Sequence, residues 1–454
     1  MKALLLVGIL MCAALPNRWI APALPLIWVL ERLLPPALSF VTNIGPIALS
    51  PTDLLILLLV GKLAVWTVLR KELVIERSIA FALGIYLVVN FVATIAAGLK
   101  FGEGALAASL TPLARFSAEA LVILLVSQAV PTLAHAKRFL LVLLGTLTLL
   151  AAIQYINAVG AGQGFVIGEV QGLERGEARY FGPVGDSIGV VLLLGYLAAL
   201  CFRSVVGALL FLGAILLTAG LGAILATAVG TAFFLFFGLR RPEIRAFAQR
   251  RLFLVPLLAL AILAALIVFP SSLGTTLTSR VTSGTYLESG AQRKASSELA
   301  GAMILDNPLL GVGYMGFEQA LGKYGGDAYF NLQNPDGGTA NANNQILQAL
   351  TDSGVPGLLA FLGLVFCAAR LFYRIVAWDG DRFVSASYLA AFLWLLTQLF
   401  GNLAAVWLNP ASFVTRLLWV LLGVAIGITR LLPTAESISA PSHSSRSRPQ
   451  LLPA

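Results

Sequence analysis

The chain alternates long apolar stretches with short polar ones, and one polar stretch is far longer than the rest. It covers residues 271–344, from Ser271 to Asn344. Apolar stretches long enough for a helix to cross a bilayer stand on both sides of it. We therefore expect residues 271–344 to lie outside the membrane and to carry the chemistry.

Hydropathy predicts the membrane spans. The first begins behind Lys2 and resembles a signal peptide, but apolar sequence resumes at Trp19, so we expect an uncleaved span bent at Pro16. Further spans are predicted at 52–69, 78–98, 105–128, 138–158, 187–203, 204–219, 221–239, 252–270, 346–376, 383–407 and 411–430. Region 204–239 is either one long helix or two short ones turning at Gly220-Leu221-Gly222. The expected fold class is all-α, a polytopic integral membrane protein of about twelve transmembrane helices with one long extracytoplasmic loop.

Four regions follow from this pattern. Residues 1–270 form the N-terminal transmembrane helices (about nine spans), and 271–344 form a long periplasmic loop with short helices. Residues 345–432 form the C-terminal transmembrane helices (about three spans). Residues 433–454, rich in Ser, Pro and Arg, are expected to be a disordered cytoplasmic tail.

Composition agrees with a membrane protein, since 59% of residues are hydrophobic and only 11% are charged, against about 25% charged in soluble domains. The net charge of +9 comes from basic residues in short loops between spans, which is the cytoplasmic Lys/Arg bias of membrane proteins and not a nucleic-acid surface. The densest groups are Arg70, Lys71 and Arg77; Lys137 and Arg138; Arg240, Arg241, Arg245, Arg250 and Arg251; and Arg370, Arg374 and Arg382. With twelve spans all four groups fall on one side. We expect both termini to be cytoplasmic and 159–186 and 271–344 to lie on the outer side of the membrane.

The outer segments supply arginines suited to phosphate. Arg179 and Asp186 stand where a span begins, and 271–344 holds Arg280, Arg293 and Lys294. A guanidinium offers a permanently charged fork of donors to phosphate oxygens, although Arg179 could equally anchor a helix end by snorkelling. Acids outnumber bases in 271–344, so a cationic patch requires folding. Ser296–Leu305 is predicted to be an amphipathic helix that Asp306-Asn307-Pro308 stops. Gly311, Gly313 and Gly316 are expected to form a close-approach turn.

Other features bear on chemistry less directly. The outer segments contain no His, and no Asp/Glu/His cluster has metal-ligand spacing, so neither a metal nor another cofactor is expected. Within the spans, Arg115 and Glu119 stand four residues apart and either neutralise each other or mark a functional site. Asp352 and Arg416 are further candidates, expected near a membrane face.

Three motifs resemble the O-antigen ligase and polymerase superfamily, polytopic enzymes that act on lipid-linked glycans at the outer face of the bacterial inner membrane. The first is Arg179-Tyr180-Phe181-Gly182 followed by Asp186-Ser187. The second is Ser289-Gly290-Ala291-Gln292-Arg293 with Asp306-Asn307-Pro308-Leu309-Leu310-Gly311-Val312-Gly313. The third is Asn343-Asn344-Gln345-Ile346-Leu347-Gln348 followed by Asp352-Ser353-Gly354-Val355-Pro356-Gly357.

The resemblance implies transfer of a glycan from an undecaprenyl-diphosphate carrier to an acceptor hydroxyl, with chain-length regulator or flippase proteins as partners. It implies catalytic roles for Arg179, Arg293 and Arg280 as diphosphate ligands, and substrate-binding roles for Tyr180, Asp186, Lys294, Asn343 and Asn344. Asn343 and Asn344 either orient the acceptor or cap the span that starts at Gln345. A base is supplied by an acid of 271–344 or is absent.

Two departures from the family bear on the reaction. Asn343 stands where ligases carry a His, and Gly220-Leu221 stands where many members have Ser-Arg. Because that His is thought to activate the ligase acceptor, the resemblance favours an O-antigen or exopolysaccharide polymerase over a ligase for lipopolysaccharide. A transporter is the competing class, but the halves show no repeat and the polar residues gather at one face. A structural subunit would explain the spans but not the ordered motifs.

Overall fold

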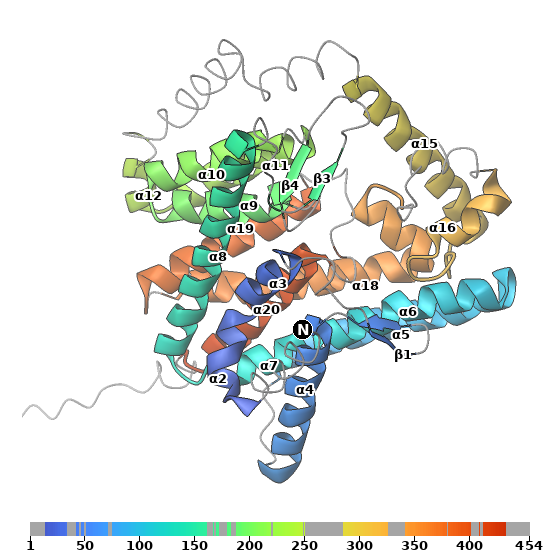
Figure 1. The fold of residues 1–454 in the computed structure, drawn as a ribbon, viewed down its shortest axis with the longest axis horizontal. Coiled ribbons are helices and arrows are strands. Elements are labelled where there is room, and N and C mark those ends of the chain that lie inside the picture. The colour runs from blue at the N-terminus through green and yellow to red at the C-terminus, as the bar shows by residue number, and fades with distance from the viewer. Residues whose placement is uncertain are drawn as a thin grey trace, which may run out of the picture.

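The computed structural model describes residues 14–33, 42–44, 47–49, 51–70, 75–160, 167, 169–171, 179–182, 188–218, 221–247, 249, 285–325, 341–378, 380–400, 408 and 412–432. Helices account for most of these residues (Figure 1). The described chain begins with α2 (Asn17–Ile20), the 3-10 helix η1 (Ala21–Ala23), α3 (Leu24–Leu33), β1 (Thr42–Ile44), β2 (Ile47–Leu49) and α4 (Pro51–Arg70). It continues with α5 (Arg77–Phe101), α6 (Glu103–Ala120), α7 (Val122–Gln128), α8 (Leu133–Gly160), β3 (Glu169–Gln171) and β4 (Arg179–Gly182).

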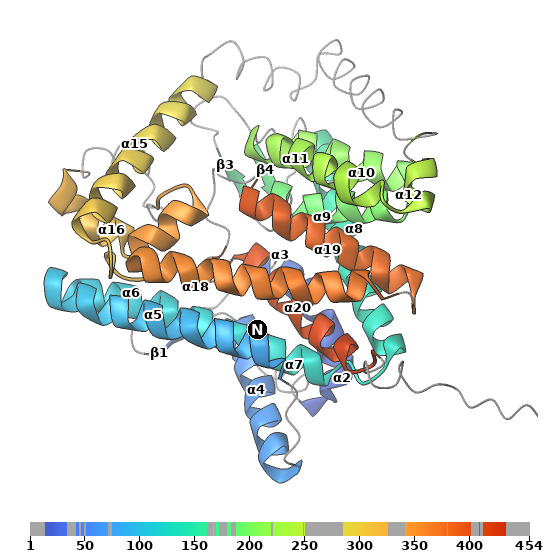
Figure 2. The same cartoon turned by 180° about the vertical axis from the view of Figure 1, so that it is seen from behind.

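The second half of the described chain holds two groups of helices. The first comprises α9 (Ile188–Cys201), α10 (Val205–Leu217), α11 (Leu221–Gly238) and α12 (Pro242–Phe247). The second comprises α15 (Thr285–Asp306), α16 (Phe317–Ala320), the 3-10 helix η6 (Leu321–Tyr324), α18 (Gln345–Val376), α19 (Arg382–Phe400) and α20 (Phe413–Thr429). From behind, α11, α19, α18 and α5 lie side by side in that order (Figure 2).

Five helical segments are long and apolar enough to cross a membrane, and they agree with predicted spans: α5, α6 with α7, α8, α18 and α19. The shorter apolar helices α9, α10, α11 and α20 match four more. Region 204–239 forms two helices, α10 and α11, as one of the two interpretations predicted. The chain is thus a helical, multi-pass membrane protein. The span at 252–270 lies outside the described residues, and the total of twelve stays a prediction.

Two small antiparallel hairpins interrupt the helical pattern. β1 pairs with β2, and β3 pairs with β4 so that Gln171 faces Arg179 and Val170 faces Tyr180. Each strand has only three or four residues. Strands this short leave no periodic signal, so the expectation of an all-α fold missed them.

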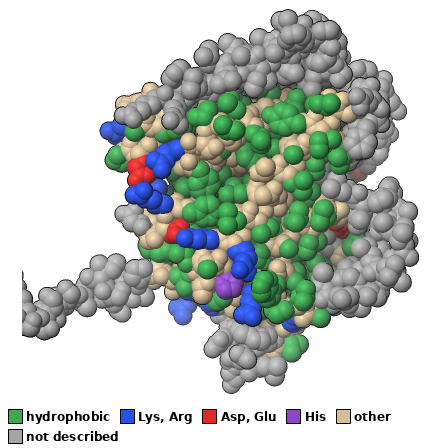
Figure 3. Space-filling model, turned by 60° about the vertical axis from the view of Figure 1, so that its left-hand side comes forward, with side chains coloured by type: hydrophobic (Ala, Val, Ile, Leu, Met, Phe, Trp, Pro, Cys, Tyr) green, Lys and Arg blue, Asp and Glu red, His purple; other side chains and the backbone are tan. Residues whose placement is uncertain are grey.

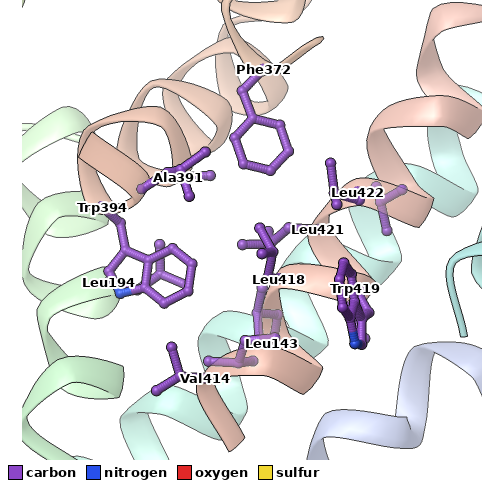
Figure 4. Close-up of a cluster of buried hydrophobic side chains, with 14 of the residues drawn as sticks. Leu143, Leu194, Phe372, Ala391, Trp394, Val414, Leu418, Trp419, Leu421 and Leu422 are labelled. Carbon is purple, nitrogen blue, oxygen red and sulfur yellow. The ribbon is translucent and has the colours of Figure 1, made fainter. Parts of the chain in front are cut away.

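The apolar core lies where α8, α9, α18, α19 and α20 meet. Leu143, Leu194, Phe372, Trp394 and Leu418 come from these five helices in turn, and all are buried (Figure 4). The indole N–H of Trp394 donates to the carbonyl of Val190 at 2.9 Å, so its single polar atom is satisfied within the core. This packing fixes α18, whose N-terminal half carries the third motif.

Ion pairs join several of the predicted loops at one end of the bundle. Lys137 pairs with Asp381 at 2.5 Å, Arg374 with Glu76 at 3.5 Å, and Glu243 with both Arg203 and Arg382. In Figure 3, charged side chains gather along one margin of a largely apolar face. The basic loops predicted to share one side therefore do contact one another. Which side of the membrane they face stays a prediction.

The described part of 271–344 folds over the opposite end, beside the joint between α5 and α6. Its α15 starts at Thr285, well before the predicted Ser296, and ends at Asp306 as predicted. A separate apolar cluster lies beneath it, made of Ala300, Met303, Val312, Phe317, Ala320, Leu321 and Ala342. This cluster gives the described part of 271–344 a small core of its own.

Candidate functional site

The glycine turn of the second motif docks on a break in α18. Pro356 has no N–H to donate, so the carbonyl of Asp352 loses its helical partner, and Ser353 and Gly354 leave helical geometry. The N–H of Gly313 donates to Asp352 O at 2.9 Å, and that of Val312 donates to Thr351 O at 2.8 Å. In return, the N–H of Val355 donates to Pro308 O at 2.8 Å. The second and third motifs thus satisfy each other's backbone.

Two glycines make this close docking possible. A Cβ at Gly311 would stand 2.4 Å from the backbone of Asp352 and Thr351, and one at Gly354 would stand 2.4 Å from Pro308 O. Both glycines also have φ near +60°, where a side chain is strained. The expected close-approach turn is confirmed. What it approaches is the protein's own helix.

Side chains of α5 hold the same turn from the other side. Ser353 donates to Asn90 Oδ1 at 2.5 Å, and Thr94 Oγ1 accepts the N–H of Tyr314 at 3.3 Å. Asn90, Thr94 and Ser353 are all buried. The turn is therefore clamped between α5 and α18, which fixes the end of α15 that leads into it.

The residues before α18 form a second ordered turn. Asn344 caps α18, because its Oδ1 accepts the N–H groups of Ile346 and Leu347 at 2.8 and 3.1 Å. The capping interpretation of Asn344 is therefore confirmed. Asn343 has φ +54° and takes no part in the cap. Its backbone N–H donates to Asn341 Oδ1, and its side chain donates to Ser296 Oγ on α15 at 3.0 Å.

Arg293 and Lys294 stand on α15 about one turn before Ser296. Arg293 is half-buried, and among the described residues its guanidinium has no ion-pair partner. Lys294 is exposed and lies 3.9 Å from Glu298, one turn further along the helix. The bond from Asn343 to Ser296 thus brings Asn343 to the face of α15 that also carries Arg293, one turn earlier, whereas Lys294 points to a different face of the helix.

Two lysines that the motifs did not include lie on the same side of the molecule. The ammonium groups of Lys100 and Lys323 both stand 5.6 Å from the ring centre of Phe101, and Lys100 bonds to Asn307 Oδ1. Asn307 in turn donates to the hydroxyl of Tyr324 at 3.0 Å. Burial raises the pKa of that hydroxyl, so it stays protonated. The place of Lys100 near the end of a predicted span, just before a polar loop, was a sequence signal that could have pointed to it. No such signal marked Lys323.

The other site predictions fall in or beside β4. Arg179 and Tyr180 belong to this strand, which packs against α8. Through its pairing with β3, this strand places Arg179 opposite Gln171 and Tyr180 opposite Val170. Asn157 of α8 binds the backbone of Ile167 through both N–H and C=O, at 2.8 and 3.0 Å, so it ties the start of this loop to the bundle. Arg280 and Asp186 lie outside the described residues.

A group of four charged side chains joins α4, α6 and α20, three of them buried and the fourth, Arg115, half-buried. Arg416 lies 3.1 Å from Asp53 and 2.9 Å from Glu119, while Arg115 lies 2.9 Å from Asp53 and 3.6 Å from Glu119. The guanidinium carbon of Arg416 also stands 5.5 Å from the ring centre of Trp28. The expected Arg115–Glu119 pair is therefore half of a larger neutral group. Arg416 and Asp352, expected near a membrane face, are buried inside the protein.

Among the described residues, no group of three His, Cys, Asp or Glu side chains could hold a metal ion. The described site does offer a guanidinium and a carboxamide, because Arg293 of α15 and Asn343, just before α18, lie about one helical turn apart on the face marked by Ser296.

Comparison with known proteins bears on the part of the chain that contains the second and third motifs. No curated protein matches the chain. Residues 206–362 match the family model described as O-antigen ligase. This range contains the second and third motifs in full, and the first motif precedes it. The resemblance to the O-antigen ligase and polymerase superfamily is thereby confirmed over residues 206–362.

Proposed function

We propose that the protein is a membrane glycosyltransferase, which moves glycan repeat units from an undecaprenyl-diphosphate carrier to an acceptor sugar hydroxyl at the outer face of the inner membrane. The observation that carries the proposal is the bond from Asn343 to Ser296, one turn beyond Arg293. It places Asn343, at the position where ligases carry a His, within about one helical turn of Arg293, the Arg of the second motif. The match to an O-antigen ligase model over the same residues supports it.

In the proposed reaction the acceptor oxygen attacks the anomeric carbon of the donor, and the bond from that carbon to the diphosphate oxygen breaks. The leaving diphosphate gains negative charge as this bond lengthens. Arg293, with Arg179 and Arg280 from the neighbouring segments, would stabilise that charge without a metal ion. Lys294, Tyr180 and Asp186 would bind the substrates, and the acceptor proton would pass to solvent or to the released diphosphate.

Asn343 favours a polymerase over a ligase. A neutral imidazole can take a proton from a hydroxyl, whereas a carboxamide offers hydrogen bonds and no basic nitrogen. The side-chain N–H of Asn343 already donates to Ser296, which leaves its carbonyl oxygen to accept from an acceptor hydroxyl. Ligation to a lipid A-core acceptor is the second candidate, because the matched family is described as a ligase.

The test is glycan transfer by purified protein in detergent, supplied with a polyprenyl-diphosphate-linked repeat unit and, separately, with a lipid A-core acceptor. We expect lengthening of the lipid-linked glycan, which Arg293→Ala slows by about 10²–10³-fold. Arg374→Ala, at the opposite end of the bundle, should leave it unchanged. Transfer to lipid A-core alone would overturn polymerase in favour of ligase. Absence of turnover with either acceptor, together with movement of the lipid-linked glycan between vesicle leaflets, would establish a transporter instead.

A further inference from the structure

A buried side chain links α18 to the turn that carries Asn343. The amide Nε2 of Gln348 donates to Asp352 Oδ1 at 2.7 Å. Its Oε1 accepts the backbone N–H of Ala342 at 2.9 Å. Gln348 is 1% exposed and Asp352 is 4% exposed, so water does not compete for these bonds.

The direction of this link is set by chemistry. A backbone N–H only donates, so Ala342 requires the C=O end of the Gln348 amide to face it. The NH₂ end must then point toward Asp352 Oδ1, which accepts from it. Gln348 thereby joins the turn before α18 to Asp352.

The residue fixed in this way is the neighbour of Asn343. Asn343 adopts φ +54°, a left-handed conformation that Asn tolerates better than most non-glycine residues. Ala342 is fully buried and bound to Gln348 on one side of Asn343, and the cap of Asn344 fixes the other. The side chain of Asn343 is consequently directed to Ser296.

Asp352 also belongs to the glycine turn. Its carboxylate receives the backbone N–H of Met315, which has φ +54°, and its carbonyl receives the N–H of Gly313. One residue therefore holds both the turn that follows α15 and, through Gln348, the turn that precedes α18.

We propose that Gln348 and Asp352 are positioning residues for glycan transfer: they hold Asn343 beside Arg293 without touching either substrate. The proposal rests on the proposed function. The rate of transfer then depends on the hydrogen bond between Gln348 and Asp352, which is buried in α18 away from the reacting groups.

A reciprocal exchange tests the link. Gln348→Glu places two carboxyl groups face to face and removes the amide donor, whereas Gln348→Glu with Asp352→Asn restores a donor opposite an acceptor with their positions exchanged, and leaves an acceptor for Ala342. We expect the single variant to slow transfer about 10–100-fold at saturating donor, with the KM for donor unchanged, because loss of a buried hydrogen bond costs that much. The double variant should return to within about threefold of the natural protein.

Hydrogen exchange at the amides of Ala342 and Asn343, followed by mass spectrometry, reports the link without turnover. Exchange should speed up by about tenfold or more in Gln348→Glu and return to normal in the double variant. Should Gln348→Glu not fold, Gln348→Met removes both bonds without adding charge and should show the same faster exchange. Unchanged exchange at these amides in a folded variant would overturn the proposal.

Combination with Asn343→Ala separates positioning from general stability. If Gln348 acts through Asn343, Gln348→Met should slow transfer no further once Asn343 is Ala, whereas a purely structural role would give effects that multiply. Multiplying effects would overturn the proposal while leaving the proposed function intact. Failure of the proposed function would instead appear as absence of transfer by the natural protein, with the exchange results still reporting the link.

Discussion

The side chain of Asn343 donates to Ser296 Oγ at 3.0 Å, across 47 positions of sequence. This bond is the described link between the residues preceding α18 and the face of α15 near Arg293. Ser296 is fully buried, so the bond lies beneath the surface on which Arg293 is half-exposed. The amide N–H of Asn343 is thus held by a buried side chain of α15.

Ser296→Ala should weaken transfer more than it weakens the fold. It removes the acceptor of the Asn343 amide and creates almost no cavity, so we expect about a tenfold slower rate, equivalent to one hydrogen bond. The thermal midpoint in detergent should fall by only a few degrees. Parallel measurement of rate and midpoint checks this. A variant with the natural rate would show that Asn343 needs no support from α15.

Gly354→Ala should destabilise the docking of the glycine turn on α18. The new Cβ would meet Pro308 O at 2.4 Å in a backbone of φ +65°, and the backbone strain alone costs about 1–3 kcal/mol. Gly363→Ala is the matched control on the same helix, where a Cβ meets nothing within 4 Å. Denaturant unfolding in detergent should show a loss for the first and none for the second. Equal midpoints would contradict the tight docking.

Arg416→Met should be among the most destabilising single changes. It removes the ion pairs of the buried Asp53 and Glu119 with Arg416, and breaking a buried ion pair by removing one partner costs about 3–5 kcal/mol. Arg374→Ala removes a pair with Glu76 that is open to water, for which we expect less than about 1 kcal/mol. The two variants are compared by unfolding under identical detergent conditions. Similar losses would mean that the buried group contributes no more than a surface pair.

The Lys137–Asp381 pair should make stability depend on pH. Burial raises the pKa of the Asp381 carboxyl, but the Lys137 ammonium and the N–H of Val384 lower it further, so the net pKa lies below its usual value. A carboxylate with a lowered pKa stabilises the folded state above its unfolded pKa of about 3.9 and loses that contribution as the pH falls. The gap in thermal midpoint between the natural protein and Asp381→Asn should therefore shrink between pH 7 and pH 3. A constant gap would contradict this assignment.

The sequence predicted the described spans well because their signal is local. Runs of apolar residues bounded by Arg or Lys mark α5, α8, α18 and α19 directly. The end of α15 was also predictable, since Asn307-Pro308 stops a helix. Its first turns were not, because Thr285–Ala295 has no apolar period to detect.

The site was only partly predictable because its bonds join distant positions. Asn344 could be recognised as a cap from its place before an apolar run. The partnership of Asn343 with Ser296, and that of Arg416 with Asp53 across 363 positions, leaves no mark on local pattern. Asp53 was not singled out in the sequence, where it stands in the first turn of a predicted span. Its role depends on Arg416, in a helix near the other end of the chain.

That distance has a consequence for how the protein enters the membrane. α4 and α6 are synthesised long before α20, so Asp53 and Glu119 must wait for Arg416. An acidic side chain carried into the membrane without a partner is costly, and Arg115 of α6 is a basic partner that the early helices supply to both acids. Insertion of α20 thus brings in Arg416, the positive charge that pairs with the acids of α4 and α6. A nascent chain that stops short of Arg416 would present quality-control proteases with an unfinished bundle.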